Sequence, residues 1–222
     1  MFAVNEIAQN YLLEHNVIFD VLYINDYATI YKYFEQDNNM DIVVTSNTHL
    51  LEFLQEKYGA ESFDIAKDKL ALYADQDSMI YANLKDTNNF SMADLLTTIS
   101  NVANIVCGNF DETIDGMHTK AALEKAQVLH KIADRLVLVK DDEAIRYLTG
   151  KSKTVGIMLK NTEKLTSDDM KIISIFKDYD IIYNVAILAN AKKKAEALSF
   201  IEFLRTKAAQ AILEKHGFTI GK

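Results

Sequence analysis

The side chains that could do covalent chemistry are few and scattered along the chain. Four of the five histidines stand alone in the sequence, at His15, His49, His130 and His216. Ser46 is the only serine with a histidine close by, and no acid follows at a spacing that would orient a nucleophile–base pair. The sequence therefore predicts a protein that is not an enzyme and that needs no cofactor.

Two further stretches could be mistaken for reactive sites. Cys107 is the only cysteine, so an internal disulfide is impossible, and its apolar setting in "NIVCGN" predicts a small buried core residue. The stretch "GNFDETIDG" is rich in turn-forming residues, but it lacks the glycine spacing and the lysine of a phosphate-binding loop. Neither stretch indicates catalysis.

Composition and charge exclude other classes of protein. The 222 residues carry a net charge of −8, which argues against nucleic acid as a partner. Acidity still allows a small anion, because neutral donors at helix N-termini can hold one. No apolar run approaches the roughly 18 residues of a membrane span. Met1 leads directly into a helical pattern without a signal peptide, so a mature secreted form and a cytoplasmic protein both stay open.

Short β-branched runs alternate with helical patterns along the whole chain. Strands are expected at residues 17–24, 41–46, 69–74, 104–109, 135–140, 154–159, 171–176 and 181–188. Helices are expected at residues 28–34, 48–57, 91–100, 116–127, 142–148 and 191–215, the last closed by Gly217. Such alternation predicts an α/β fold, and eight strands suit two modest sheets better than one wide sheet. Ligands in such folds bind where the strands end and helices begin.

The C-terminal stretch "FIEFLRTKAAQAILEKHGF" resembles the end of the periplasmic molybdate-binding proteins of ABC transporters. The matching residues are Phe200, Phe203, Leu204, Thr206, Ala209, Gln210, Ile212, Leu213, Gly217 and Phe218. Upstream, "NNMDIVVTSNTHL", "FDIAKDKLALYA", "NIVCGNFDETIDGMHTKAALEKA" and "AIRYLTGKSKTVGIML" are similar to successive family segments in the right order.

The resemblance implies a two-lobed fold of the periplasmic-binding-protein type. It would consist of two mostly parallel sheets flanked by helices, with a ligand cleft between the lobes. We expect lobe 1 to comprise residues 1–76 plus 187–222, and lobe 2 residues 77–186. The resemblance further implies a periplasmic monomer that binds a small oxyanion such as molybdate or tungstate and passes it to an ABC permease.

The resemblance also implies which residues face the ligand. In the family, hydroxyls and main-chain N–H groups hold the oxyanion without a countercharge. The corresponding positions here are Asn25, Asp26, Tyr27, Ser46, Asp115, Gly116 and Asp141. The family's first strand, with its ligand-binding serine, would lie upstream of Met1.

Several of these positions carry a carboxylate where the family pattern has a neutral residue. A deprotonated Asp26 facing an anion about 4 Å away opposes binding by roughly 4 kcal/mol at an effective dielectric near 20. Asp26, Asp115 and Asp141, with His118, could instead favour a cation or an amine. Three hypotheses follow: an oxyanion-binding transport protein, the same fold with a changed ligand, or a degenerate relative acting as a sensor or interaction module.

Overall fold

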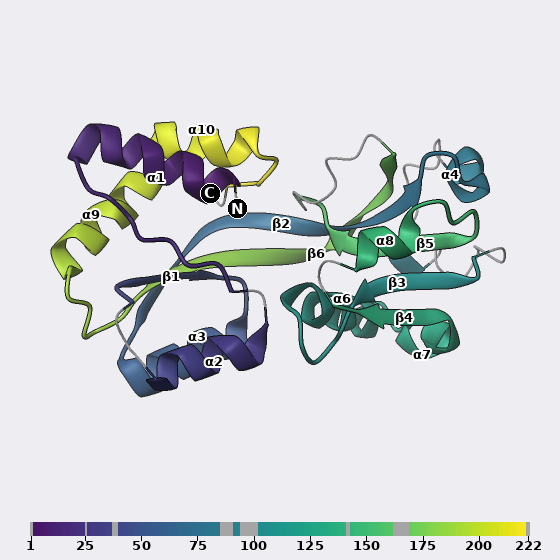
Figure 1. The fold of residues 1–222 in the computed structure, drawn as a ribbon, viewed down its shortest axis with the longest axis horizontal. Coiled ribbons are helices and arrows are strands. Elements are labelled where there is room, and N and C mark those ends of the chain that lie inside the picture. The colour runs from purple at the N-terminus through teal and green to yellow at the C-terminus, as the bar shows by residue number, and fades with distance from the viewer. Residues whose placement is uncertain are drawn as a thin grey trace. The chain divides into compact units, whose positions relative to one another are not determined.

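The computed structural model describes residues 2–24, 26–36, 40–84, 91–93, 102–140, 143–161 and 169–220 (Figure 1). Its helices are α1 (Phe2–His15), α2 (Tyr27–Gln36), α3 (Thr48–Tyr58), α4 (Met79–Leu84), α6 (Ile114–Lys125), α7 (Leu129–Ile132), the 3-10 helix η1 (Ala133–Arg135), α8 (Ala144–Leu148), α9 (Lys194–Leu204) and α10 (Lys207–Lys215). Its strands are β1 (Ile42–Thr45), β2 (Glu61–Asp75), β3 (Asn104–Gly108), β4 (Leu136–Val139), β5 (Thr154–Leu159) and β6 (Met170–Ile187).

The strands form one six-stranded mixed sheet in the order β1-β6-β2-β5-β3-β4. β3 pairs parallel with β4 and β5, whereas β1 pairs antiparallel with β6, and β2 with β5. The α/β class is confirmed, but a single mixed sheet replaces the two mostly parallel sheets that we expected. The two long strands β2 and β6, of 15 and 18 residues, account for the difference because each contributes to both compact units described next.

The chain divides into two compact units, each built from non-contiguous segments. Unit 1 comprises residues 1–24, 29–68 and 181–222, and unit 2 comprises residues 25–28 and 69–180. The predicted strands at 171–176 and 181–188 are in fact the single strand β6. The polar residues between them stay in the strand because Lys69 bonds the Lys177 carbonyl and pairs with Asp180, while Lys125 bonds the Asp178 carbonyl.

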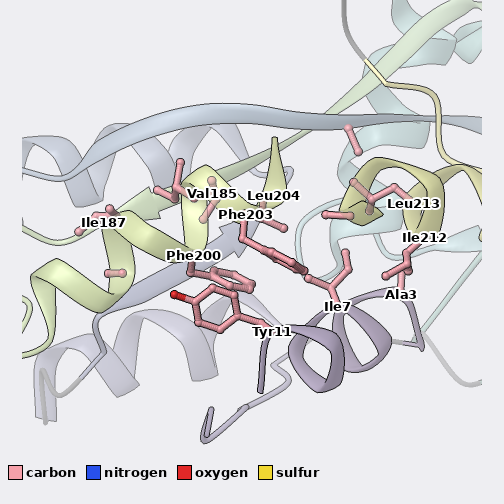
Figure 2. Close-up of a cluster of buried hydrophobic side chains, with 14 residues drawn as sticks. Ala3, Ile7, Tyr11, Val185, Ile187, Phe200, Phe203, Leu204, Ile212 and Leu213 are labelled. Atoms are coloured by element: carbon pink, nitrogen blue, oxygen red, sulfur yellow. The ribbon is translucent and has the colours of Figure 1, made fainter. Parts of the chain in front are cut away.

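In unit 1, helices cover both faces of the sheet. Alternate residues of β6 point to opposite faces, so Val185 and Ile187 belong to the core cluster with α1, α9 and α10, while Ala186 belongs to the cluster with α2 and α3. Ala3, Ile7 and Tyr11 form one stripe of α1 at four-residue spacing. Figure 2 shows Tyr11 against Phe200 and Phe203, and its hydroxyl donates to Oγ of Ser199 over 2.8 Å.

Three predictions for unit 1 need revision or comment. The helix expected over 191–215 breaks at Thr206, whose hydroxyl caps the first turn of α10 by accepting from the Ala209 amide. Gly217 closes α10 with φ of 83°, as predicted. The strand expected over 17–24 is wrong, since this segment belongs to no strand.

In unit 2, β3 lies between β4 and β5, and both α6 and α8 pack on β3 and β5. Core residues on the α8 side include Val106, Leu148 and Met158. The predicted helix at 116–127 begins two residues earlier, at Ile114. The helix predicted at 91–100 falls largely outside the described residues. No helix in the described ranges has both the length and the apolarity of a membrane span.

Candidate functional site

Two of the segments expected to hold a ligand meet in unit 2. Asp26 forms an isolated antiparallel bridge with Thr113, and the Tyr27 amide donates to the Glu112 carbonyl over 3.4 Å. The structure therefore brings Asp26 and Tyr27 to the loop that leads into α6, where Asp115 and Gly116 lie.

Thr113 organises the first turn of α6. Its backbone is extended (φ −121°, ψ 149°), and its hydroxyl accepts from the Gly116 amide over 3.0 Å, which makes it the N-cap. The same hydroxyl donates to the Asn109 carbonyl over 3.0 Å. Thr113 is buried, so this cap is a fixed part of the site.

The two glycines of the loop allow the chain to fold back on itself. A Cβ at Gly116 would lie 2.0 Å from the Asn109 carbonyl oxygen, and one at Gly108 would lie 2.4 Å from the Thr113 hydroxyl. Both distances are far inside van der Waals contact. The end of β3 and the start of α6 therefore approach so closely that only glycine fits at these two positions.

The loop uses many of its own main-chain donors. The side-chain oxygen of Asn109 accepts from the Asp111 amide, and the Asn109 carbonyl accepts from the Thr113 amide, each over 3.0 Å. Ile114 is the first residue of α6, so its amide has no acceptor within the helix and points toward the helix N-terminus, where the partial positive charge of the helix is concentrated.

Carboxylates surround this turn. Asp26, Asp111 and Glu112 are exposed and Asp115 is half-buried, all within the two segments joined by the Asp26–Thr113 bridge. Nζ of Lys120 lies 3.6 Å from a carboxylate oxygen of Asp111 and offsets part of this charge. The site thus combines a positive helix end with an acidic rim, and the two have opposite effects on an anion.

Of the remaining predicted residues, Ser46 belongs to unit 1. Ser46 is buried in unit 1, between the end of β1 and Asn47, whose side chain caps α3 by accepting from the Leu50 amide. Asn25 and Asp141 lie outside the described residues.

His118, considered above for a cation site, is part of the interior of unit 2. It is buried, and its Nδ1 lies 3.2 Å from the hydroxyl of Tyr179 on β6. Burial raises the pKa of Tyr179, so the phenol keeps its proton. Across the described parts of the chain, no group of three or more His, Cys, Asp or Glu side chains is arranged to hold a metal ion.

Our reading of the sequence missed Thr113 and Asn109, which shape the loop. The signal was present, because Thr113 directly precedes a helical pattern and Asp115 falls in its first turn, as in capped helices. Placing the helix start at Gly116 instead of Ile114 hid the cap. The contacts of Asn109 join residues two and four positions apart in an irregular loop, for which the sequence holds no periodic signal.

The fold matches that of known solute-binding proteins. Residues 1–219 match the family described as bacterial extracellular solute-binding protein, and the chain belongs to this family. It is 29% identical over 131 residues to the Bacillus subtilis (strain 168) protein YvgL, whose name proposes an ABC transporter substrate-binding lipoprotein. That match covers 56% of this chain and only half the length of YvgL. The chain is therefore a solute-binding protein by family, and the prediction that it is not an enzyme is confirmed.

Solved structures of similar fold have low sequence identity to the chain. The substrate-binding domain of a proposed molybdenum ABC transporter from Clostridium difficile has a TM-score of 0.74 at 19% identity, covering 100% of this chain and 94% of that one. The periplasmic molybdate-binding protein of Azotobacter vinelandii has a TM-score of 0.72 at 15% identity, covering 100% and 95%. A proposed phosphate ABC transporter substrate-binding protein with bound phosphate, from Clostridium perfringens, has a TM-score of 0.68 at 15% identity, covering 99% and 95%. At these identities the likeness shows the fold alone.

Proposed function

We propose that the protein captures a small tetrahedral oxyanion of the molybdate or tungstate type outside the cytoplasm and delivers it to its permease. The observation that carries this proposal is the start of α6. There the Thr113 cap, the Cβ-free Gly116 and the Ile114 amide form a fixed helix N-terminus, whose main-chain donors suit an anion. Neighbours of the same fold are named for molybdate or hold phosphate, which supports the same class of ligand.

The acidic rim favours a second candidate, a ligand that carries an amine or a divalent cation. Asp26, Asp111, Glu112 and Asp115 lie around the same turn, and Asp111 pairs with Lys120. Each carboxylate about 4 Å from a unit negative charge opposes it by about 1 kcal/mol if fully solvated and about 4 kcal/mol near the protein surface. The two candidates therefore predict opposite effects when a rim charge is removed.

A thermal-shift experiment distinguishes the candidates. The protein is heated with molybdate, tungstate, phosphate and sulfate, and separately with divalent metal chlorides and small amines. An oxyanion with micromolar Kd, present at millimolar concentration, adds about 4 kcal/mol to the free energy of unfolding. We expect such a shift with at least one oxyanion. A shift only with metals or amines would overturn the oxyanion proposal and support the second candidate, and no shift with any compound would favour a sensor or interaction module.

Charge-neutral variants sharpen the result. Asp115→Asn removes a rim carboxylate and should tighten oxyanion binding about fivefold, the equivalent of about 1 kcal/mol. Asp134→Asn, at an exposed position of η1, is the matched control and should leave the affinity unchanged. Oxyanion binding that is unchanged in Asp115→Asn, as in the control, would show that the start of α6 does not face the anion.

A further inference from the structure

The region around α9 in unit 1 is basic, although the protein is acidic. Residues 191–208 hold five lysine and arginine residues against two glutamates, a net charge of +3, whereas the whole chain carries −8. The other residues therefore hold 19 basic and 30 acidic side chains, a net charge of −11. Such an uneven distribution of charge is typical of a surface that meets an anionic partner. The five basic side chains are exposed and define the α9 surface: Lys192, Lys193, Lys194, Arg205 and Lys207.

α9 presents part of this charge on one side of the helix. Lys194, Leu198 and Arg205 follow one another at spacings of four and seven residues, so they share one side of α9. Leu198 is 42% exposed and lies between the two cations. Cζ of the Arg205 guanidinium lies 5.1 Å from the centre of the Phe63 ring, a contact that restrains this cation at the end of the helix. In Figure 1, α9 runs along the periphery of unit 1.

Two carboxylates lie close to the first part of the α9 surface. An oxygen of Glu196 lies 3.9 Å from Nζ of Lys193, and Asp41 accepts from the Lys193 amide over 3.0 Å. The ion pair is exposed, so it is weak and screened by salt. The side chains of Lys194 and Lys207 have no ion pair or hydrogen bond with any residue that the structure describes. The α9 surface therefore keeps an excess of positive charge.

The opposite face of the sheet in unit 1 does not share this excess. It is covered by α2 and α3, which carry three glutamates against two lysines: Glu35, Glu52, Glu56, Lys32 and Lys57. α9 packs on the other face of the sheet. An anionic plane would thus attract the α9 surface and would not attract α2 and α3, so it would orient unit 1.

We propose that the α9 surface docks the protein on an anionic membrane surface. A plane of lipid phosphates attracts lysine and arginine, and its boundary with the acyl chains accepts an exposed apolar side chain such as Leu198. The 11 residues of α9 span about 16 Å, so cations at both ends of the helix reach a flat surface together. Each cation near such a surface strengthens binding about fivefold. The docking is therefore reversible, and it is independent of the ligand that the protein carries.

Cosedimentation of the whole chain with lipid vesicles, without any oxyanion, tests this proposal. One set of vesicles contains equal parts of phosphatidylglycerol and phosphatidylcholine, and the other contains phosphatidylcholine alone. We expect binding to the anionic vesicles at about 20 mM salt, and weaker binding at about 150 mM salt, because salt screens exposed charges. Binding to the neutral vesicles should be at least about tenfold weaker.

Two double variants locate the binding surface. Lys194→Gln with Lys207→Gln removes two cations of the α9 surface and should weaken binding to the anionic vesicles about 25-fold. Lys151→Gln with Lys153→Gln is the matched control, because both lysines are exposed in unit 2 and the net charge changes by the same amount. The control should bind within about twofold of the wild type, since its charges lie away from the docked surface.

Three results would overturn the proposal: no binding to the anionic vesicles at low salt, equal binding to both kinds of vesicle, or equal losses in the two double variants. The last would show that net charge governs binding and the α9 surface does not. Binding to soluble heparin but to neither kind of vesicle would also overturn it, because the partner would then be a polyanion and not a membrane. None of these results bears on the ligand at α6, since no oxyanion is present.

Discussion

Gly116→Ala is the most informative single substitution at the start of α6. The new Cβ would lie 2.0 Å from the Asn109 carbonyl oxygen, 2.4 Å from its carbon and 2.6 Å from the Gly108 carbonyl oxygen. All three atoms belong to the backbone, so no side chain can rotate to make room. Either the 108–113 loop or the first turn of α6 must move by about 1 Å, because real contacts of this kind stay near 3 Å or more.

The magnitude follows from two opposing effects. Overpacking usually costs about 1–3 kcal/mol, and a clash with backbone belongs at the upper end, about 3 kcal/mol. Replacing glycine by alanine within a helix returns up to about 1 kcal/mol. The net loss of about 2 kcal/mol corresponds to a fall in Tm of about 4–8 °C for a chain of this size.

The assay is calorimetric unfolding with and without the best oxyanion from the thermal-shift panel. Gly116→Ala should lower the Tm and also abolish the ligand-induced increase, because the shifted loop displaces the Thr113 cap and the Ile114 amide. Gly150→Ala is the control, because its Cβ would meet nothing within 4 Å. The φ of 69° at this position costs alanine about 1 kcal/mol, so the Tm should fall while the ligand-induced increase remains. A Gly116→Ala protein with wild-type Tm and wild-type ligand response would refute the geometry of the site.

Three further predictions concern single residues. Thr113→Ala should lower the free energy of unfolding by about 1 kcal/mol because the α6 cap is lost, whereas Thr113→Ser keeps the hydroxyl and should lose much less. Equal losses for the two variants in urea titrations would contradict the role of the cap. Hydrogen bonds from Lys215 and then His216 hold the pKa of Glu6 below its ordinary 4.5, so this contact stabilises the fold above pH 4.5 and is lost as the pH falls through the lowered pKa. When Tm is measured against pH, the Tm of Glu6→Gln should therefore fall less steeply below about pH 4.5 than the Tm of the wild type. Equal falls in Tm for the two proteins would contradict this. Burial raises the pKa of Cys107 to about 12, so a thiol reagent at mildly alkaline pH should react only as urea unfolds the protein, and rapid labelling of the folded chain would disprove its burial.

Much of the fold could be predicted because local patterns coincide with buried faces. β5 was predicted with its exact bounds, since "TVGIML" is a short apolar run, and its residues 154–158 are buried. The segment 17–24 has an equally good pattern, yet it is no strand, because a strand also requires a neighbour to pair with. Whether a neighbouring strand lies beside a segment depends on the whole fold, which no local window of sequence contains.

The site could be predicted only in outline. The resemblance led to Asp26, Tyr27, Asp115 and Gly116, which the structure brings together in unit 2. The hydrogen bonds that fix the loop depend on Thr113 and Asn109, whose roles follow from the fold-back at two glycines. The balance between the helix end and the acidic rim depends on distances, which composition and spacing do not provide.

The central claim, that the turn at the start of α6 binds a small oxyanion, is tested most directly by isothermal titration calorimetry. Molybdate, tungstate and phosphate are titrated in turn into the wild-type protein and into Gly116→Ala. We predict saturable binding of at least one oxyanion, with one anion per chain, and its loss in Gly116→Ala. Absence of heat with every oxyanion, or equal binding by the two proteins, would contradict the claim.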